Sequence, residues 1–436
     1  MKITDLNGKK ICILGFGKEG QAMLTAIERY APHAEVTISD RNEKIADQLL
    51  TTHYSLLTGP HWLEGLDRFD VLIKSPGIPP LPKLTTDHLP LTTPTEIFFD
   101  SIAGSKALTI GVTGSKGKST TASLIAAILK VDNRNVVLVG NIGEPAIAHL
   151  AEATHETIFV MELSSYQLMD LKTSPHVAVV TSFFPEHLDY HGSVEAYLNA
   201  KKNITRHQSD GQYVFFCSTS TGAAEIAKEG DGTKIPFSAD DAPVAIEETH
   251  LLGMHNLSNI AGAFIVAEKL GVPRETAIEA IRNFHGLPHR LQNLGERDGL
   301  IWVDDAISTT PESTIAALDA LGDNVAAIIL GGQDRGYDFS VLGQRIASSK
   351  IKTVILFPGS GGRIRRAIEE ANADVSFFEA DSMENAVTIA KKEVRGQKTE
   401  VSHHAIVLLS TASPSYGMFK NFEEKGDLFK AAIMAL

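Results

Sequence analysis

Cysteine, tryptophan and positive charge are all scarce in this chain of 436 residues. It has two tryptophans and two cysteines, Cys12 and Cys217, each in an apolar run that predicts a buried strand. Two such cysteines cannot form a disulfide framework, so we expect reduced core thiols in a cytoplasmic protein. Lys and Arg total 40 against 53 Asp and Glu, a formal charge of -13. This balance argues against nonspecific binding to nucleic acid, because no basic field covers the molecule.

Long apolar runs are also lacking, which excludes several classes of protein. No stretch approaches the roughly 18 apolar residues of a membrane span. The N-terminal run ICILGFG is too short for a signal peptide and is followed by a polar, helix-like segment. The length exceeds one ordinary core, and the content of 43% hydrophobic and 21% charged residues is typical of globular domains. We therefore expect no membrane partner and two or three domains.

The stretch LTIGVTGSKGKSTT, residues 108–121, has the layout of a phosphate-binding loop. An apolar run predicts a strand, glycines form the turn, and a helix-like segment follows, so backbone N–H groups and the helix N-terminus can surround phosphate oxygens. The general motif places glycine where this chain has Val112. The alternative is a glycine turn that merely enters a helix. The candidate ATP-binding residues are Thr113, Gly114, Ser115, Lys116, Gly117, Lys118, Ser119 and Thr120.

A second glycine turn lies near the N-terminus. Gly15, Gly17 and Gly20 satisfy G-x-G-x-x-G, with Asp40 twenty residues beyond the last glycine. This fingerprint is typical of dinucleotide-binding folds and makes an NAD-dependent oxidoreductase a rival interpretation. A UDP diphosphate would fit the same turn, and a purely structural turn is the remaining alternative.

Polar residues follow several predicted strands in the middle of the chain. Glu162 ends one strand, and His187 lies beyond the next. Together with the Ser119 hydroxyl they suit a magnesium site, although magnesium prefers oxygen ligands and an isolated His187 is more typical of a hydrogen-bonded loop. Lys201 lies on a predicted helix, four residues after Tyr197, and by itself is typical of a surface lysine.

The alternation of strands and helices predicts an α/β protein of three domains. We expect an N-terminal Rossmann-like domain at 1–100 and a central, P-loop ATPase-like domain with a mostly parallel sheet at 101–291. A C-terminal Rossmann-like domain would occupy 292–436. The Pro- and Thr-rich stretch at 80–106 is predicted to link the first two.

Nine motifs occur in one order along the chain: TGSKGKST at 113, NIG at 141, ELSSYQL at 162, EHLDYHG at 186, YLNAK at 197, MHNLSN at 254, LPHR at 287, GGQDRGYDF at 331 and FKNFEEKG at 419. Together they resemble the Mur ligases of peptidoglycan synthesis, and most closely the glutamate-adding branch. The resemblance implies an acid–amino-acid ligase that uses ATP and Mg²⁺. Its substrates would be UDP-N-acetylmuramoyl-L-alanine and D-glutamate, joined through an acyl phosphate. A monomer is the expected state.

The resemblance also assigns roles to residues by their match to family motifs. Lys118, His187 and Lys201 would be catalytic, and Lys201 matches the lysine that the family carbamylates. The implied metal ligands are Ser119, Glu162, His187 and carbamylated Lys201. Further nucleotide contacts would be Asn256, Asn259, Arg290 and Asp305. The UDP substrate would contact Gly15, Phe16, Gly17, Asp40, Ser75 and Asn141. Glutamate would contact Thr309, Arg335, Ser415 and Phe422.

Departures from the family pattern gather where the amino acid should bind. Ile307 occupies the position of a family lysine, Arg335 replaces another lysine, and residues 410–415 read STASPS where the family has SPACAS. These changes leave the ATP chemistry intact and leave the amino acid open between D-glutamate, L-glutamate and another amino acid. A nucleotide-binding module without enzyme activity and a folate-type glutamate ligase are the remaining alternatives.

Overall fold

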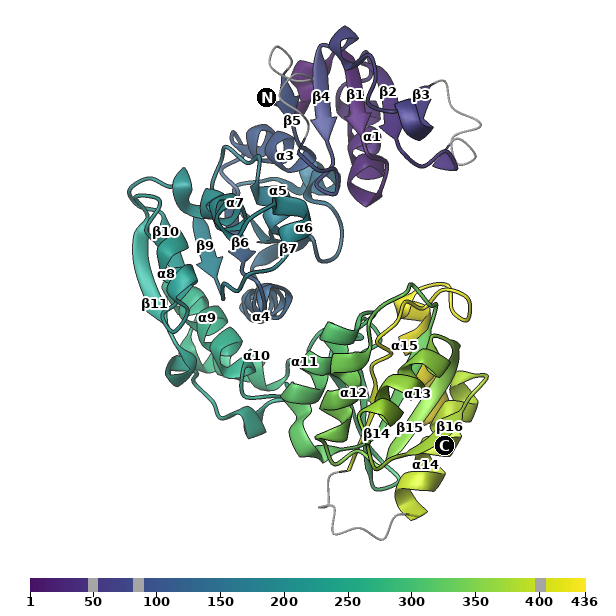
Figure 1. Ribbon diagram of the computed structural model, residues 1–436. Helices are drawn as coiled ribbons and strands as arrows, with labels where there is room; N and C mark the ends of the chain where they lie inside the picture. Colours follow the sequence, from purple (N-terminus) through teal and green to yellow (C-terminus); the bar gives the residue numbers. More distant parts are fainter. Residues whose placement is uncertain (46–53, 81–89, 397–404) are drawn as a thin grey trace. The chain divides into compact units, whose positions relative to one another are not determined.

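The computed structural model describes residues 1–45, 54–80, 90–396 and 405–436. The chain forms two compact units (Figure 1). The first comprises Met1–Pro243 and Leu257–Ile281, and the second comprises Val244–Asn256 and Arg282–Leu436. The first unit contains two sheets and the second contains one. The predicted α/β class with three mainly parallel sheets is confirmed, while the domain boundaries 1–100, 101–291 and 292–436 stay predictions.

The first sheet is entirely parallel, with strand order β3-β2-β1-β4-β5. Its central strand, KICIL, is buried at four of five positions, as expected for a strand covered on both faces. The elements are β1 (Lys10–Leu14), α1 (Lys18–Tyr30), β2 (Glu35–Asp40), β3 (Ser55–Thr58), β4 (Val71–Lys74), β5 (Leu91–Thr92) and α3 (Pro94–Ile102).

The stretch 80–106 is not the simple link that its composition predicts. Residues 81–89 of this link lie outside the described residues, but the rest includes strand β5 and helix α3. Thr93 caps the helix by accepting a hydrogen bond from the Glu96 N–H, and Pro94 fits the first turn. Ile97, Phe98 and Phe99 are buried, so packing outweighs the turn-forming composition.

The second sheet is also parallel, with order β11-β10-β9-β6-β8-β7. Strand β6 lies between β8 and β9, so the carboxyl ends of these three strands meet at one edge, where α/β sheets bind ligands. Its strands are β6 (Leu108–Thr113), β7 (Asn135–Gly140), β8 (Thr157–Glu162), β9 (Val177–Val180), β10 (Tyr213–Cys217) and β11 (Thr233–Phe237). The helices are α4 (Lys118–Val131), α5 (Ser165–Leu168), α6 (Leu188–His191), α7 (Val194–Arg206), α8 (Thr221–Ala227), α9 (Asn256–Lys269) and α10 (Arg274–Arg282).

The third sheet has order β12-β13-β17-β14-β15-β16, and only the β12–β13 pair is antiparallel. Its strands are β12 (Gln292–Arg297), β13 (Leu300–Asp304), β14 (Val325–Gly332), β15 (Thr353–Gly359), β16 (Ser376–Glu379) and β17 (Ile406–Leu409). The helices are α11 (Pro311–Leu321), α12 (Ser340–Ala347), α13 (Gly361–Glu370), α14 (Met383–Gly396) and α15 (Phe422–Met434). The edge strands β12 and β16 escape prediction because both are only partly buried and lack a continuous apolar run.

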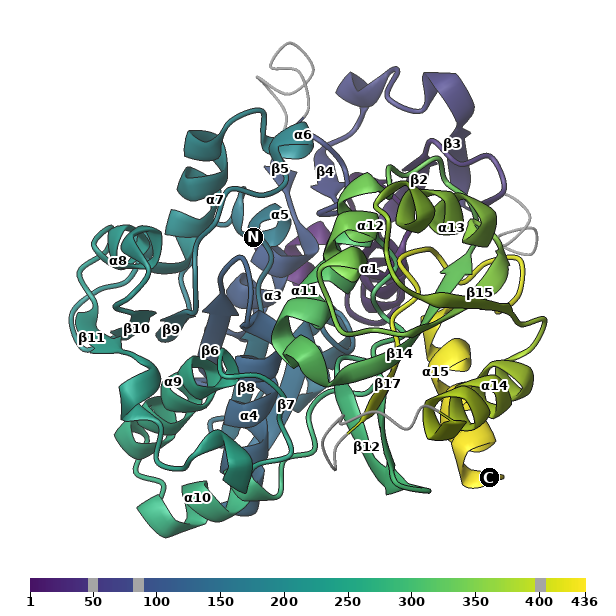
Figure 2. The same ribbon diagram turned by 60° about the horizontal axis from the view of Figure 1, so that its bottom comes forward.

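Alternation along the strands places a separate core on each face of the third sheet. Ala327 and Ile329 pack in the core that includes residues of α14 and α15, whereas Ile328 and Leu330 pack with α11, α12 and α13 (Figure 2).

Short 3₁₀ turns complete the chain: η1 (Ile3–Leu6), η2 (Gly59–His61), η3 (Leu66–Arg68), η5 (Ala146–Glu152), η6 (Ala239–Asp241), η7 (Ile246–Glu248) and η8 (Gly322–Asn324). Cys12 and Cys217 are free and buried, which confirms the prediction of core thiols. Of the residues that the structure describes, no helix has the length and apolarity required to cross a bilayer.

Candidate active site

The loop between β6 and α4 requires glycine at two positions. Gly114 has φ 152° and Gly117 has φ 85°, in the region that favours glycine. A Cβ at either position would come closer than 3.0 Å to a neighbouring oxygen, Thr181 Oγ1 or Asn259 Oδ1 respectively. The conformation of this loop therefore depends on the absence of side chains at positions 114 and 117.

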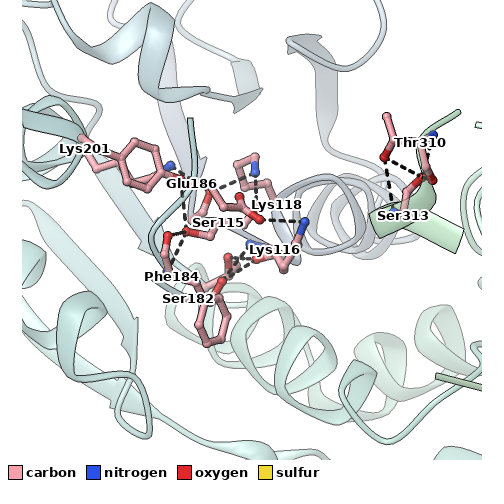
Figure 3. Close-up of polar contacts among 12 residues, drawn as sticks. Ser115, Lys116, Lys118, Ser182, Phe184, Glu186, Lys201, Thr310 and Ser313 are labelled. Carbon is pink, nitrogen blue, oxygen red and sulfur yellow. Dashed lines mark hydrogen bonds and ion pairs between the residues drawn. The ribbon is translucent and has the colours of Figure 1, made fainter. Parts of the chain in front are cut away.

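The loop ends with Lys118, the first residue of α4. The Lys118 amine donates hydrogen bonds to the carbonyls of Gly114 (2.9 Å) and Ser115 (2.7 Å), as Figure 3 shows. Ser119 is buried in the first turn, beside the half-buried Thr120. Lysine and hydroxyl groups at the N-terminus of a 14-residue helix form a site suited to phosphate oxygens.

Glu162 ends β8 beside the start of this loop, because Val112 and Glu162 are register partners. The residue is 2% exposed, and one carboxylate oxygen accepts a hydrogen bond of 3.2 Å from the Asn141 side chain. The other oxygen, Oε2, has no hydrogen-bond partner among the described residues. A buried carboxylate oxygen without a partner is costly, and a hard cation with oxygen ligands would satisfy it. The described residues contain no group of three or more His, Cys, Asp or Glu side chains arranged to hold a metal.

Lys201 is not the surface residue that its position on an isolated helix suggests. It is 1% exposed, and its amine donates a 2.9 Å hydrogen bond to the Gly114 carbonyl (Figure 3). The amine also lies 4.8 Å from the centre of the Tyr197 ring. Burial lowers the pKa of Lys201 well below its usual value, and the nearby charge of Lys118 lowers it further. A buried lysine amine with a lowered pKa loses its proton more readily than an exposed one, and the neutral amine is nucleophilic.

His187 lies at the edge of the same region, where it precedes helix α6 with φ 57°. Its ring lies 5.2 Å from that of Tyr166 and 5.9 Å from that of Tyr197. Partial desolvation lowers the pKa of His187, the charges of Lys118 and Lys201 lower it too, and Glu186 opposes them. The lowered pKa favours the neutral imidazole, which can ligate a cation or accept a proton.

The N-terminal glycine turn borders a cavity of about 750 Å³. The Phe16 N–H donates to Asp40 Oδ2 (2.7 Å), and the Ser75 hydroxyl donates to the Gly15 carbonyl (2.8 Å). Predicted residues Gly15, Phe16, Gly17, Asp40 and Ser75 therefore lie together. The cavity is lined by Asp40, Arg41, Glu43, Gly59, Pro60, Trp62, Gly77, Ile78 and Pro79. Sequence reasoning missed Trp62 and Arg41, which carry no motif. Asn141, predicted for the same ligand, lies instead beside Glu162 on the second sheet.

The two predicted asparagine contacts fall in different units of the chain. Asn259, in the first unit, accepts a 3.3 Å hydrogen bond from Thr121 at the start of α4. Asn256, in the second unit, donates a 2.8 Å hydrogen bond to the Leu252 carbonyl. Both side chains are buried.

A buried acidic pair ends β13 in the second unit. The Asp304 carboxylate lies 2.8 Å from His289 Nδ1, and Asp305 accepts hydrogen bonds from the Ser410 hydroxyl (2.8 Å) and the Leu291 N–H (3.1 Å). Burial raises the pKa of Asp305 to about 6, although its hydrogen bonds and the charge of Arg290 act in the opposite direction. Arg290 itself is exposed.

Helix α15 adds a buried lysine that sequence reasoning missed. The Lys425 amine donates a 2.6 Å hydrogen bond to the Thr411 hydroxyl, and burial lowers its pKa to about 8. Phe422 lies one turn earlier on the same helix, with its ring 6.1 Å from that of His289. In the motif FKNFEEKG, Phe422 and Lys425 are three residues apart and therefore lie on the same face of a helix. This spacing was the sequence signal that could have pointed to Lys425.

The remaining residues predicted to bind glutamate lie in the segments that follow strands β13, β14 and β17. Ser415 is buried, and its hydroxyl has no hydrogen-bond partner in the described part of the chain. Arg335 is exposed; it donates to the Gln333 side chain (3.2 Å) and lies 5.9 Å from the Tyr416 ring centre. Thr309 and Ile307 are half-buried.

Comparisons with known proteins agree with this architecture. The Mur ligase middle domain matches residues 112–242, and the glutamate ligase domain of Mur ligases matches residues 289–410. A UDP-N-acetylmuramoyl-L-alanine–L-glutamate ligase of Salinispora tropica is 35% identical, over 99% of both chains. A UDP-N-acetylmuramoylalanine–D-glutamate ligase of Streptococcus sanguinis is 32% identical, over 100% of this chain and 99% of the relative.

Solved structures share the fold at low sequence identity. The MurF structure from Acinetobacter baumannii has a TM-score of 0.59 at 14% identity, covering 98% of this chain and 93% of that one. The UDP-N-acetylmuramate-alanine ligase MurC from Thermotoga maritima has a TM-score of 0.57 at 16% identity, covering 98% and 99%. These structures show the shared fold. Because both family domains match and the two ligase relatives are 35% and 32% identical over the full length, the chain belongs to the Mur ligase family and is an ATP-dependent ligase of peptidoglycan biosynthesis.

Proposed function

We propose that this Mur ligase joins glutamate to UDP-N-acetylmuramoyl-L-alanine, with ATP as the energy source. The full-length similarity to two relatives named for glutamate ligation of this UDP substrate carries the proposal. Family membership leaves no support for the NAD-dependent oxidoreductase suggested by the N-terminal glycines. We further expect a cytoplasmic monomer.

The reaction has two steps. An oxygen of the alanyl carboxylate attacks the γ-phosphorus of ATP, an O–P bond forms, and ADP leaves with the electrons of the broken bond. The glutamate amine then attacks the carbonyl carbon of the acyl phosphate and loses a proton, and inorganic phosphate leaves as the amide forms. The neutral imidazole of His187 is one acceptor for that proton, and a phosphate oxygen is the other.

The first step brings like charges together. Two unit charges 4 Å apart repel by about 4 kcal/mol at an effective dielectric of 20, so several uncompensated pairs would block the attack. Lys118 supplies compensating charge, and its amine must leave the loop carbonyls of Gly114 and Ser115 to meet phosphate. Mg²⁺, bound through Ser119, Glu162 and His187, would neutralise further phosphate charge, and the unpartnered oxygen of Glu162 fits this role.

Lys201 would act as a carbamate. The neutral amine attacks the carbon of CO₂, an N–C bond forms as one C=O π pair moves onto oxygen, and a proton leaves to solvent, which converts a neutral amine into an anion. Burial and the charge of Lys118 favour this chemistry by disfavouring the ammonium form. The product is an additional oxygen ligand for a cation beside the phosphate loop.

The UDP moiety would occupy the cavity beside the N-terminal glycine turn. The glycine turn at Gly15, Phe16 and Gly17 would lie beside the diphosphate, with the N–H groups of Gly15 and Phe16 already donating to the Ser39 carbonyl and to Asp40. Trp62 in the cavity wall would offer an aromatic face to the base. Asn141, next to Glu162, would meet the substrate nearer its reacting end.

D-Glutamate is our first candidate for the amino acid, and L-glutamate is the second. The candidate contacts are Thr309, Arg335, Ser415 and Phe422. The second isomer is favoured by Ile307 at the position of a family lysine and by the name of the Salinispora relative.

The decisive experiment measures phosphate release with ATP, Mg²⁺ and UDP-N-acetylmuramoyl-L-alanine against a panel of amino acids. We expect release that depends on both the UDP substrate and one glutamate isomer. Equal ATP hydrolysis with and without the UDP substrate would contradict the proposal. Activity with a folate-type acceptor in its place would favour the folate-type alternative.

A further inference from the structure

Tyr190 connects the wall of the UDP cavity to the helix that follows His187. It lies in α6, and its hydroxyl is within donating distance of the carbonyls of Pro76 (2.9 Å) and Ile78 (2.7 Å). These carbonyls belong to the turn after β4, where Gly77 and Ile78 line the cavity of about 750 Å³. The turn belongs to the first sheet and α6 to the second, so this contact crosses between the two layers of one unit.

A second side chain attaches the same turn to the second layer. The Lys74 amine is buried at the end of β4, where it donates to the Ile78 carbonyl (3.2 Å). It also forms an ion pair of 2.9 Å with Asp170, which lies just beyond α5. The Ile78 carbonyl thus receives two donors, Tyr190 and Lys74, and its position depends on both layers.

The other side of Tyr190 leads to the phosphate loop through a series of contacts. Its ring packs against Tyr166 at 4.3 Å, edge to face, and Tyr166 lies 5.2 Å from His187. His187 lies 5.9 Å from Tyr197, whose hydroxyl is 3.1 Å from the Ser115 hydroxyl in the loop. Every step from the cavity wall to the loop is therefore a direct side-chain contact.

Helix α6 has four residues, which is too short to set its own orientation. The left-handed backbone of His187 before it and the left-handed Gly192 after it make the segment dependent on tertiary contacts. A ligand that contacts Gly77 or Ile78 and shifts this turn would also shift α6, because the Tyr190 hydroxyl is hydrogen-bonded to the turn. The position of the His187 side chain, directly before α6, would change with it.

We propose that Tyr190 is a positioning residue that couples occupancy of the UDP cavity to nucleotide binding at the phosphate loop, through α6 and His187. The inference rests on the proposed function, because it takes the cavity ligand to be the UDP substrate. By thermodynamic linkage, each ligand raises the affinity of the other by the same factor.

The test compares nucleotide affinity with and without the second substrate. Calorimetry gives the Kd of a non-hydrolysable ATP analogue with Mg²⁺, in the absence and presence of saturating UDP-N-acetylmuramoyl-L-alanine. The ratio of the two values is the coupling factor. Tyr190→Phe retains the ring contacts but removes the hydroxyl, and Tyr213→Phe, on β10 and outside this series of contacts, is the matched control.

We expect the wild-type ratio to exceed about three and Tyr190→Phe to reduce it about threefold or more towards one, the effect of losing one hydrogen bond. Tyr213→Phe should keep the wild-type ratio. Tyr190→Leu, which also removes the contact with the Tyr166 ring, should bring the ratio to one.

The midpoint temperature of thermal unfolding distinguishes a positioning role of Tyr190 from a contribution to stability alone. A lower midpoint with an unchanged ratio in Tyr190→Phe overturns the inference, as does a wild-type ratio of one or an equal loss in Tyr213→Phe. A wild-type protein that neither binds nor turns over the UDP substrate refutes the proposed function as well. Wild-type turnover with an unchanged ratio in Tyr190→Phe refutes only the coupling.

Discussion

Replacing Gly117 with alanine tests how the phosphate loop is built. Gly117 has φ 85°, and a left-handed residue other than glycine costs about 1–2 kcal/mol. The new methyl group would also overlap Asn259 Oδ1, which accepts a hydrogen bond from the Thr121 hydroxyl. Asn259 is buried and cannot turn into solvent, so displacing it would break that hydrogen bond at a cost of about 1 kcal/mol. We therefore expect a total loss of about 2–3 kcal/mol in the stability of the first unit.

Gly271 is the matched control, because its φ is also 85° but no atom lies within 4 Å of its ideal Cβ position. Gly271→Ala should lose only the backbone strain of about 1–2 kcal/mol. Urea unfolding followed by circular dichroism measures both variants, and calorimetry measures their ATP affinity. Gly117→Ala should weaken ATP binding at least tenfold, while Gly271→Ala should leave it within twofold of wild type.

A second substitution tests the overlap directly. Asn259→Ser in the Gly117→Ala background removes the oxygen that the methyl group meets, so it should recover part of the lost stability without restoring ATP affinity. Equal losses of stability and ATP affinity in Gly117→Ala and Gly271→Ala would refute the argument, because the two sites share the backbone strain, whereas only Gly117 meets a neighbouring atom and lies in the phosphate loop.

Other substitutions test the chemistry of the site. Lys118→Ala should abolish acyl-phosphate formation, trapped by borohydride reduction, while UDP-substrate binding survives; near-normal turnover would contradict the role of Lys118. Lys201→Ala should be inactive and regain part of its activity with a short-chain carboxylic acid, and full activity without the acid would remove the carbamate role. Glu162→Gln should raise the Mg²⁺ concentration for half-maximal activity about tenfold or more, since the unpartnered oxygen loses its charge; an unchanged requirement would remove Glu162 from the metal site. Burial raises the pKa of Asp305 to about 6 from 3.8, so the native state disfavours the charged form, and wild-type stability falls as the pH rises through this range. Asp305→Asn lacks this dependence and should gain up to about 3 kcal/mol relative to wild type between pH 4 and 7 in urea unfolding; a constant difference across the range would refute the buried-charge argument.

The order of strands and helices could be predicted because each signal is local. Apolar runs such as KICIL and LTIGVT are the centres of parallel sheets, where both faces are covered. The glycine turns after them need positive φ, which glycine alone adopts without strain. Elements without a strong local pattern were missed, among them the edge strands β3, β11, β12 and β16 and the capped helix α3.

The sequence predicted which site residues lie together only where those residues belong to one contiguous motif. Residues 113–120 are contiguous, so their grouping follows from chain connectivity. The burial of Lys201 and Lys425 does not, because each amine meets a partner far away in the sequence, at Gly114 and Thr411 respectively. The role of Tyr190 likewise depends on a turn more than 100 residues earlier.

The sequence by itself therefore determined the α/β class, the phosphate loop and the resemblance to Mur ligases, since these depend on local composition and on the order of motifs. Tertiary structure alone decided which ionisable groups lie in a low-dielectric environment. Lys201, Lys425 and Asp305 have ordinary sequence surroundings, yet burial lowers the pKa of both lysines and raises that of the aspartate. Desolvation is a property of everything packed around a group, so no local pattern of residues encodes it.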